Sequence, residues 1–271
     1  MDRKDNFSKK SSAQSNDLIR AAYSITLNEK KLLLKAMSKI DSFNPLPSDG
    51  CITVEIAVSE CKGLYSKDNI WRELSKAASL LQSRTVTLFP SSHVREEVSW
   101  VDTSTYYEKK SLIKIKFSHT ISRKLTGLIE NFTQVELLDV AKLKSIHSVR
   151  LLELLKQVES KKKQGWLKIS VDEFRLVMGL EEKYPTFGPL YTRVIGPSID
   201  ELNKNSNWSI TLEKIKKGRA VDMLLFEFTS KTQGKLDLDK KTEKVVIKTN
   251  TKQETRKKIT EAIMNIHDTN W

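Results

Sequence analysis

The same order of secondary-structure elements occurs twice in this chain of 271 residues, and this repeat limits the possible folds more than any other feature. Apolar residues at helical spacing predict a first helix over residues 26–40, which opens with Thr26 and Glu29 as a capping box. The elements expected after it are a strand over 52–56, a short helix over 59–64, a longer helix over 68–83, a β-branched stretch over 86–89 that stops at Pro90, and strands over 98–101 and 112–117 joined by a polar stretch. The first copy therefore closes with a hairpin.

The second copy follows the same order. Its expected elements are a helix over 146–158, a strand over 167–171, a short helix over 172–180, a longer helix over 190–203, and strands over 208–215 and 221–228 around a turn. Gly218 supplies the positive φ that a tight turn needs, and Pro197 should kink the longer helix or start a new segment. Helix, strand, helix, helix and hairpin is the order of a winged helix-turn-helix, so we expect an α+β fold with two tandem winged-helix domains.

The charge balance indicates a polyanionic partner. The chain has 47 Lys and Arg residues against 34 Asp and Glu, which gives a formal net charge of +13. Each Lys or Arg placed on a phosphate releases condensed counterions, so two copies of this fold in a basic chain favour tandem readers of double-stranded DNA over one enzyme. Because no apolar run is long enough for a membrane span and Cys51 and Cys61 are the only cysteines, we expect a cytoplasmic protein without membrane association.

The repeat divides the chain into four parts. Residues 1–15 are polar, rich in Ser and Lys and without periodicity, so we expect a disordered basic arm. We expect an N-terminal winged helix over 16–131, with DNA contact and dimerisation, and a C-terminal winged helix over 132–230 as the main DNA reader. The stretch between the copies, 118–143, should be a connecting helix and a packed loop. Two interpretations of the charged tail over 231–271 stay open: a disordered extension with a nascent helix, or a docking element for a host protein or another DNA segment.

The position of a side chain in a winged helix predicts its contact with DNA. The second helix of the helix-turn-helix enters the major groove, while the wing lies along the backbone and donates Lys and Arg to phosphates. In the C-terminal copy the expected groove residues are Thr186, Tyr191, Thr192 and Arg193, and the expected phosphate contacts are Lys214, Lys216, Lys217 and Arg219. In the N-terminal copy the expected contacts are Lys67, Asn69, Arg72 and Lys76.

Each of these assignments has a plainer alternative. The basic hairpin tip could serve only to keep the protein soluble, and Arg193 could form a structural ion pair with Glu182 or another acid. The exposed face of the N-terminal helix could be merely solvated. Trp71 on that helix is more often a core anchor than a base-stacking group.

Catalytic and metal-binding alternatives find little support. A nickase needs a close pair of metal-binding His residues, whereas the four His residues are scattered at His93, His119, His147 and His267. A phosphate-binding loop of a nucleotide hydrolase needs Gly-Lys followed by Ser or Thr, but Gly234-Lys235 is followed by Leu236. The separation of the two cysteines lacks zinc-finger spacing. We therefore expect no enzymatic activity, no cofactor and no metal.

Four stretches of the chain carry a resemblance to a known family. They are QSNDLIRAAYSITLNEKKLLLKAM at 14–37, IWRELSKAASLLQSRTV at 70–86, NFTQ with the later RLLELL over 131–155, and RVIGPSIDELN followed by LEKIKKGR up to Arg219. In this order and at this spacing, they resemble the winged-helix replication initiators of iteron-bearing plasmids, the theta-type Rep proteins. The chain departs from the family before Val194, where members often carry a basic run but Leu190, Tyr191 and Thr192 precede a single Arg193.

The resemblance implies a function that composition and periodicity do not. It implies binding to direct repeats in a plasmid origin, opening of the adjacent duplex, and recruitment of the host replication initiator and helicase machinery. It also implies a homodimer in equilibrium with a monomer, where the dimer represses its own gene at an operator inverted repeat. The alternatives are a tandem winged-helix transcriptional repressor without initiator activity, which cannot support origin replication in trans, and a DNA nickase, which would cleave supercoiled DNA with a divalent metal.

Overall fold

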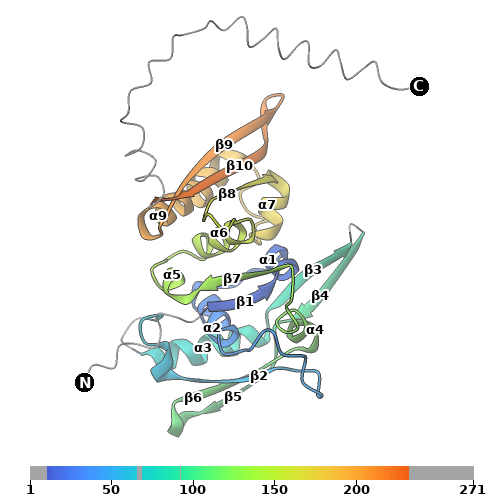
Figure 1. Ribbon diagram of the computed structural model, residues 1–271, viewed down its shortest axis with the longest axis vertical. Coiled ribbons are helices and arrows are strands. Elements are labelled where there is room, and N and C mark those ends of the chain that lie inside the picture. The colour runs from blue at the N-terminus through green and yellow to red at the C-terminus, as the bar shows by residue number, and fades with distance from the viewer. Residues whose placement is uncertain (1–10, 66–68, 92, 232–271) are drawn as a thin grey trace, which may run out of the picture. The chain divides into compact units, whose positions relative to one another are not determined.

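The computed structural model describes residues 11–65, 69–91 and 93–231 of the protein. Lys67, residues 1–10 of the predicted arm and residues 232–271 of the predicted tail lie outside this part of the chain. The first copy contains α2 (Leu27–Met37), β2 (Thr53–Ala57), the 3₁₀ helix η1 (Val58–Cys61), α3 (Ile70–Gln82), β5 (Val101–Tyr107) and β6 (Leu112–Phe117) (Figure 1). Its three strands form an antiparallel sheet in the order β2-β6-β5.

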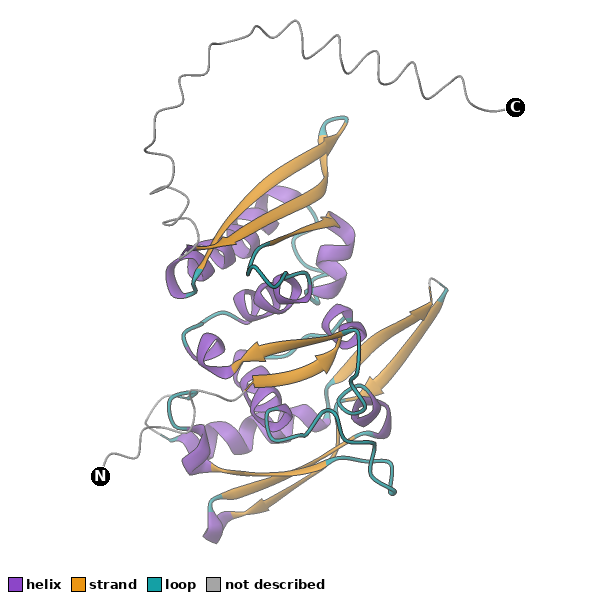
Figure 2. Ribbon diagram, in the orientation of Figure 1, coloured by secondary structure: helices purple, strands orange, loops and turns teal. Residues whose placement is uncertain are grey.

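The second copy repeats this topology. It contains α6 (Ile146–Gln157), β8 (Gly165–Ser170), α7 (Val171–Val177), the helical segments α8 (Phe187–Leu190), η3 (Tyr191–Ile195) and α9 (Gly196–Asn205), and the hairpin of β9 (Trp208–Lys217) and β10 (Ala220–Ser230). In both copies the strand after the first helix pairs with the last strand of the hairpin, because the second sheet has the order β8-β10-β9 (Figure 2). The predicted fold class, two tandem winged helices, is confirmed.

The first helix of each copy is buried on almost every side. α2 begins at the predicted capping box, where the Thr26 backbone N–H donates to Glu29 Oε2 at 2.7 Å and the Glu29 N–H donates to Thr26 Oγ1 at 3.3 Å. The residues from Glu29 to Met37 in α2 and from Ser148 to Leu155 in α6 are all buried. A helix that is buried all round packs against several elements, so these two helices form the centre of the described part of the chain.

The hairpin of the first copy differs from the prediction. Val98 belongs to β4 (Val94–Ser99), which pairs with β3 (Thr85–Ser91) in a separate hairpin that the second copy lacks in its described residues. The polar stretch 102–107 is not a loop but most of β5, and it pairs with β6. β5 is an edge strand and is mostly exposed, so it carries no apolar alternation that sequence reading could detect. β3 continues to Ser91 rather than stopping at Pro90, because the irregular register after Leu88 tolerates a missing N–H.

The predicted disordered arm is wrong for residues 11–15. They form β1 (Ser11–Ser15), which pairs antiparallel with β7 (Phe132–Glu136) in the stretch between the two copies. Ser12 and Gln14 are fully buried, and both hydrogen-bond to other elements. Polar composition did not prevent order here because long-range strand pairing satisfies the backbone, and Ser12 Oγ and Gln14 Nε2 each donate to a buried acceptor.

Short elements complete the described part of the chain. α1 (Asn16–Arg20) follows β1, η2 (Glu108–Lys110) joins β5 to β6, and α4 (His119–Arg123) and α5 (Leu137–Ala141) flank β7. The stretch between the copies therefore holds a strand as well as the predicted helix and packed loop. Among the described helices, none is long and apolar enough to cross a bilayer.

Candidate nucleic-acid interface

The recognition helix of the second copy is a continuous helix with a π-helical turn in its middle. Pro197 has no N–H to donate to the carbonyl of Arg193, and the N–H of Gly196 bonds instead to the carbonyl of Tyr191, five residues back. Leu190 and Val194 anchor the inner face of the helix in the core. The prediction that Pro197 interrupts this helix is confirmed, and the interruption is a change of hydrogen-bond pattern.

The predicted groove residues of this helix differ in their freedom to bind a ligand. Thr186 and Arg193 are exposed, and no described carboxylate lies within ion-pair distance of Arg193, Glu182 included. Thr192 is exposed, but its hydroxyl donates to the Gly188 carbonyl at 3.2 Å within the same helix. Arg193 therefore has its full set of donors available.

Lys214 on β9 has a different environment from the one expected. Its Nζ lies 3.4 Å from the centre of the Tyr191 ring and 5.7 Å from that of Phe187. The two rings stack on each other with their centres 6.0 Å apart. Lys214 thus makes a cation–π contact that ties the wing to the recognition helix, and Tyr191 is half-buried beneath it.

The wing tip, Lys216, Lys217 and Arg219, projects from the sheet at the turn between β9 and β10 (Figure 1). Gly218 has φ +64° there, the left-handed conformation that the sequence predicted. All three cations are exposed, and within the described ranges none of them forms an ion pair. Exposed cations without carboxylate partners are what phosphate contact requires.

In the first copy, three predicted contact residues lie together. Asn69, Arg72 and Lys76 line a hollow of about 570 Å³ between α3 and the beginning of α2, where Thr26 and Asn28 lie. Arg72 and Lys76 are exposed one helical turn apart. Asn69 precedes α3 in the left-handed conformation with φ 61°.

Two further side chains qualify this basic surface. Glu73 also lines the hollow, so an acid sits between its two cations. Trp71 is half-buried and packs against the core, as expected for an anchor rather than a base-stacking group. The two exposed cations of this helix are therefore accompanied by an acid.

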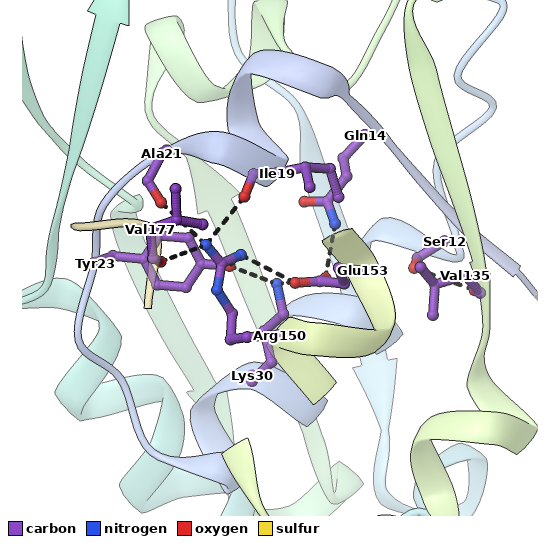
Figure 3. Close-up of polar contacts among 10 residues, drawn as sticks. All are labelled: Ser12, Gln14, Ile19, Ala21, Tyr23, Lys30, Val135, Arg150, Glu153 and Val177. Carbon is purple, nitrogen blue, oxygen red and sulfur yellow. Dashed lines mark hydrogen bonds and ion pairs between the residues drawn. The ribbon is translucent and has the colours of Figure 1, made fainter. Parts of the chain in front are cut away.

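A buried polar cluster that the sequence pattern did not predict is formed by Gln14, Tyr23, Lys30, Arg150 and Glu153 (Figure 3). Lys30 Nζ lies 2.7 Å from Glu153 Oε1, and Arg150 Nη1 lies 3.0 Å from Glu153 Oε2. Gln14 Nε2 donates to the same carboxylate at 2.8 Å, and Lys30 donates to the Tyr23 hydroxyl at 2.8 Å. The cluster links β1, α2 and α6.

Arg150 also joins the backbones of three segments. Its Nη2 donates to the carbonyls of Ile19 and Ala21 at 3.0 Å each and to that of Val177 at 2.8 Å, and its Nη1 donates to the Tyr23 hydroxyl. These carbonyls belong to the end of α1, the segment after it and the end of α7. One side chain therefore connects the N-terminal segment to both α6 and α7.

Burial shifts the pKa values of this cluster. Burial lowers the pKa of Lys30 to about 8, although the Glu153 carboxylate opposes that shift. Burial alone would raise the pKa of Glu153, but Lys30 and Arg150 outweigh it and the pKa is lowered. Burial also raises the pKa of Tyr23. Arg150 and Glu153 interrupt the apolar stretch from Val149 to Leu155 in α6, and this interruption was the signal available in the sequence.

No metal or nucleophilic site emerges in the described part of the chain, where no three side chains of His, Cys, Asp and Glu come together as a metal would need. Cys51 is half-buried and Cys61 is buried, and both are free thiols. Burial raises the pKa of the Cys61 thiol to about 11, so this thiol is protonated near neutral pH.

Two winged helices with exposed cations on the recognition helices and on the wing define a tandem winged-helix DNA-binding protein. Family models agree: residues 11–156 match the model described as initiator replication protein, WH1, and residues 170–228 match the initiator Rep protein, WH2. These matches span most of the chain, and the protein belongs to this family of replication initiators. The family consists of DNA-binding initiators, not catalytic enzymes, in agreement with the sequence-based expectation.

Individual relatives support the same assignment. A replication initiation protein of Escherichia coli is 28% identical over 219 residues, which cover 79% of this chain and 68% of the relative. An uncharacterized 27.6 kDa protein of Escherichia coli is 23% identical over 208 residues, covering 71% and 84% of the two chains. The crystal structure of the Pi initiator protein in complex with iteron DNA is similar with a TM-score of 0.70 and 23% identity, covering 82% of this chain and 98% of that one.

Proposed function

We propose that this initiator binds direct repeats at a plasmid origin, with both winged helices of one chain on the same duplex. The observation that carries the proposal is the pair of exposed basic recognition helices in one chain, and the fold shared with the iteron-bound Pi initiator supports it. Arg193 would read base edges, because a free guanidinium can donate two hydrogen bonds to guanine. The wing tip would hold phosphates, which fix the register without reading the sequence.

The proposal predicts an asymmetric binding site. Arg72 and Lys76 line one recognition helix, whereas Tyr191, Thr192 and Arg193 line the other, so the two helices should read different sequences. Two recognition helices in adjacent major grooves lie about 34 to 36 Å apart, and one chain should therefore occupy direct repeats of roughly 20 base pairs. A symmetric dimer would instead select a palindrome.

Footprinting of a monomeric preparation on a single repeat tests this model. Protection of two successive major grooves by one chain is the expected result. Protection of a half-site, or a strict requirement for a palindrome, would contradict tandem reading while leaving the family assignment intact.

The proposal extends to partners that the protein meets in the cytoplasm. After duplex opening, the initiator would recruit the host replication initiator and helicase machinery, and a homodimer in equilibrium with the monomer would repress its own gene at an inverted repeat. A transcriptional repressor on the same fold is the second candidate. Supplying the protein in trans to an origin fragment separates the two, because only an initiator lets the fragment replicate.

A further inference from the structure

The β8 edge, defined here as β8 with the loop 160–164 that precedes it, is open to a further strand. Within the described ranges β8 pairs with β10 on one side and with no strand on the other. In an antiparallel pair, every second residue points its N–H and C=O away from the partner strand. These groups are a template on which another extended chain can pair.

A large apolar side chain marks this edge. Trp166 is 65% exposed, whereas Trp100 and Trp208 are buried. It lies beside a hollow of about 530 Å³ that Val158 and Leu167 also line. Polar side chains, among them Arg20 and Gln164, line the rest of this hollow. An exposed Trp beside a hollow of mixed polar and apolar lining is typical of an anchor point in a protein interface.

The charges around the edge are mostly positive. Lys161, Lys162, Lys163 and Lys168 are exposed and form no ion pair with a described carboxylate. The loop is closed by the Ser160 N–H, which donates to the Gln164 carbonyl at 2.9 Å. Three of the four cations therefore lie on a closed turn before Trp166, and the fourth, Lys168, follows it on β8.

The acids near this edge do not neutralise it. Glu159 is held by Lys156 at 2.9 Å and accepts from Trp208 Nε1 at 3.2 Å, and Glu173 is held by Arg20 at 2.6 Å. Glu227, opposite Trp166 on β10, is exposed and unpaired among the described residues. Four free lysines against one free carboxylate favour an acidic occupant.

The β8 edge is separate from the wing. Gly165 pairs with Phe228, while the wing turn adjoins Ala220 at the other end of β10. Eight residues of strand correspond to about 26 Å, so the lysines of the loop and the wing tip lie at opposite ends of the sheet. A second copy of this edge is a poor occupant, because its lysines would repel those of the first.

We propose that the β8 edge is a docking site for an extended acidic segment of a partner protein, which adds to the sheet as a strand beside Trp166. The unpaired edge would supply main-chain hydrogen bonds, the hollow would take an apolar side chain, and the lysines would select carboxylates. Nucleic acid matches the charge but lacks the N–H and C=O ladder that the edge presents. The proposal does not depend on the reading of direct repeats.

A displayed library of random segments of about ten residues, selected on the full chain, identifies the preferred occupant. Counter-selection on the Trp166→Ala variant removes sequences that bind elsewhere. We expect enrichment of segments in which apolar residues alternate with Asp or Glu. No enrichment over the variant, or enrichment of basic segments, would overturn the proposal.

Fluorescence anisotropy with the most enriched peptide then tests the individual contacts. Trp166→Ala and the triple variant Lys161→Glu/Lys162→Glu/Lys163→Glu should each weaken peptide binding about tenfold or more, while binding to duplex DNA changes little. The matched control Lys216→Glu/Lys217→Glu, at the far end of the same sheet, should do the reverse. A peptide with Pro at a main-chain donor position should bind much more weakly if it pairs as a strand.

A labelled thymidine oligonucleotide gives the competing outcome. If single-stranded DNA displaces the peptide and loses affinity with the same Trp166→Ala change, while the Pro-containing peptide binds as well as its parent, the surface is a nucleic-acid site and the proposal is wrong. Loss of duplex binding in the wing variant, with peptide binding intact, would show that DNA binding at the wing and peptide binding at the β8 edge are independent.

Discussion

The buried polar cluster and the wing tip are both rich in cations, yet their surroundings give them opposite roles. In the cluster, Lys30 and Arg150 are fully buried and meet a carboxylate, a hydroxyl and three carbonyls. In the wing tip, three cations are exposed and find no described acid. A buried cation needs its partners for the fold to exist, whereas an exposed unpaired cation is available for a phosphate. Charge alone therefore says little about function until burial and pairing are known.

The largest expected effect comes from removing the acid of the cluster. Glu153→Gln leaves Lys30 and Arg150 buried without a countercharge and should lower the free energy of unfolding by about 3 to 5 kcal/mol. Denaturant titration measures this change, with the exposed Asp200→Asn as the matched control. Lys30→Met/Glu153→Gln should recover part of the loss. A Glu153→Gln variant as stable as the control would show that the cluster does not hold the fold together.

Removing the wing tip should change DNA binding and leave stability intact. With both winged helices engaged, log K should fall against log salt with a slope of about −5 to −7. Lys216→Ala/Lys217→Ala/Arg219→Ala should reduce that slope by up to about three, which between 1 M and 0.1 M salt is a loss of up to roughly 1,000-fold, for specific and non-specific DNA alike. An unchanged slope would mean that these three residues face solvent and do not contact phosphates. A wild-type slope shallower than about −3 would mean that one domain binds alone.

The lowered pKa of Lys30 predicts a pH effect confined to the cluster. Between about pH 8 and the ordinary lysine range near 10.5, the unfolded chain binds more protons at this position than the folded chain does. The contribution of Lys30 to stability should therefore rise with pH in this window, by at most about 1.4 kcal/mol per pH unit. Comparing the unfolding of the wild type and Lys30→Met at about pH 7.5, below this window, and at about pH 9.5, inside it, isolates the contribution of Lys30. A constant difference between the two proteins would contradict the prediction.

The smallest effect separates Lys214 from the wing tip. Since its ammonium lies on the Tyr191 ring, Lys214→Met should change the salt slope by less than Lys216→Ala does, and should change the free energy of unfolding by no more than about 1 kcal/mol. Specific binding should suffer more than non-specific binding, because the contact orients the recognition helix. Equal salt slopes for Lys214→Met and Lys216→Ala would mean that Lys214 contacts a phosphate as Lys216 does.

Local sequence patterns sufficed for much of the fold and for the exposure of several candidate contact residues. The capping box of α2, the glycine turn of the wing and the interruption at Pro197 each depend on residues within a few positions of one another. The two recognition helices and the wing follow from the order of such elements. The exposed positions of Arg193 and of the wing tip follow in turn from the winged-helix pattern.

Only the tertiary structure decided the features that join distant segments. β1 pairs with β7 across more than a hundred residues, β5 pairs without an apolar pattern, and the Lys214 ammonium lies over the Tyr191 ring. The Lys30, Arg150 and Glu153 side chains are buried together although each looks like a surface residue in the sequence. Local periodicity records which face of an element is apolar, but it does not record which other element covers that face. The partner of a polar group is therefore fixed only when the whole chain packs.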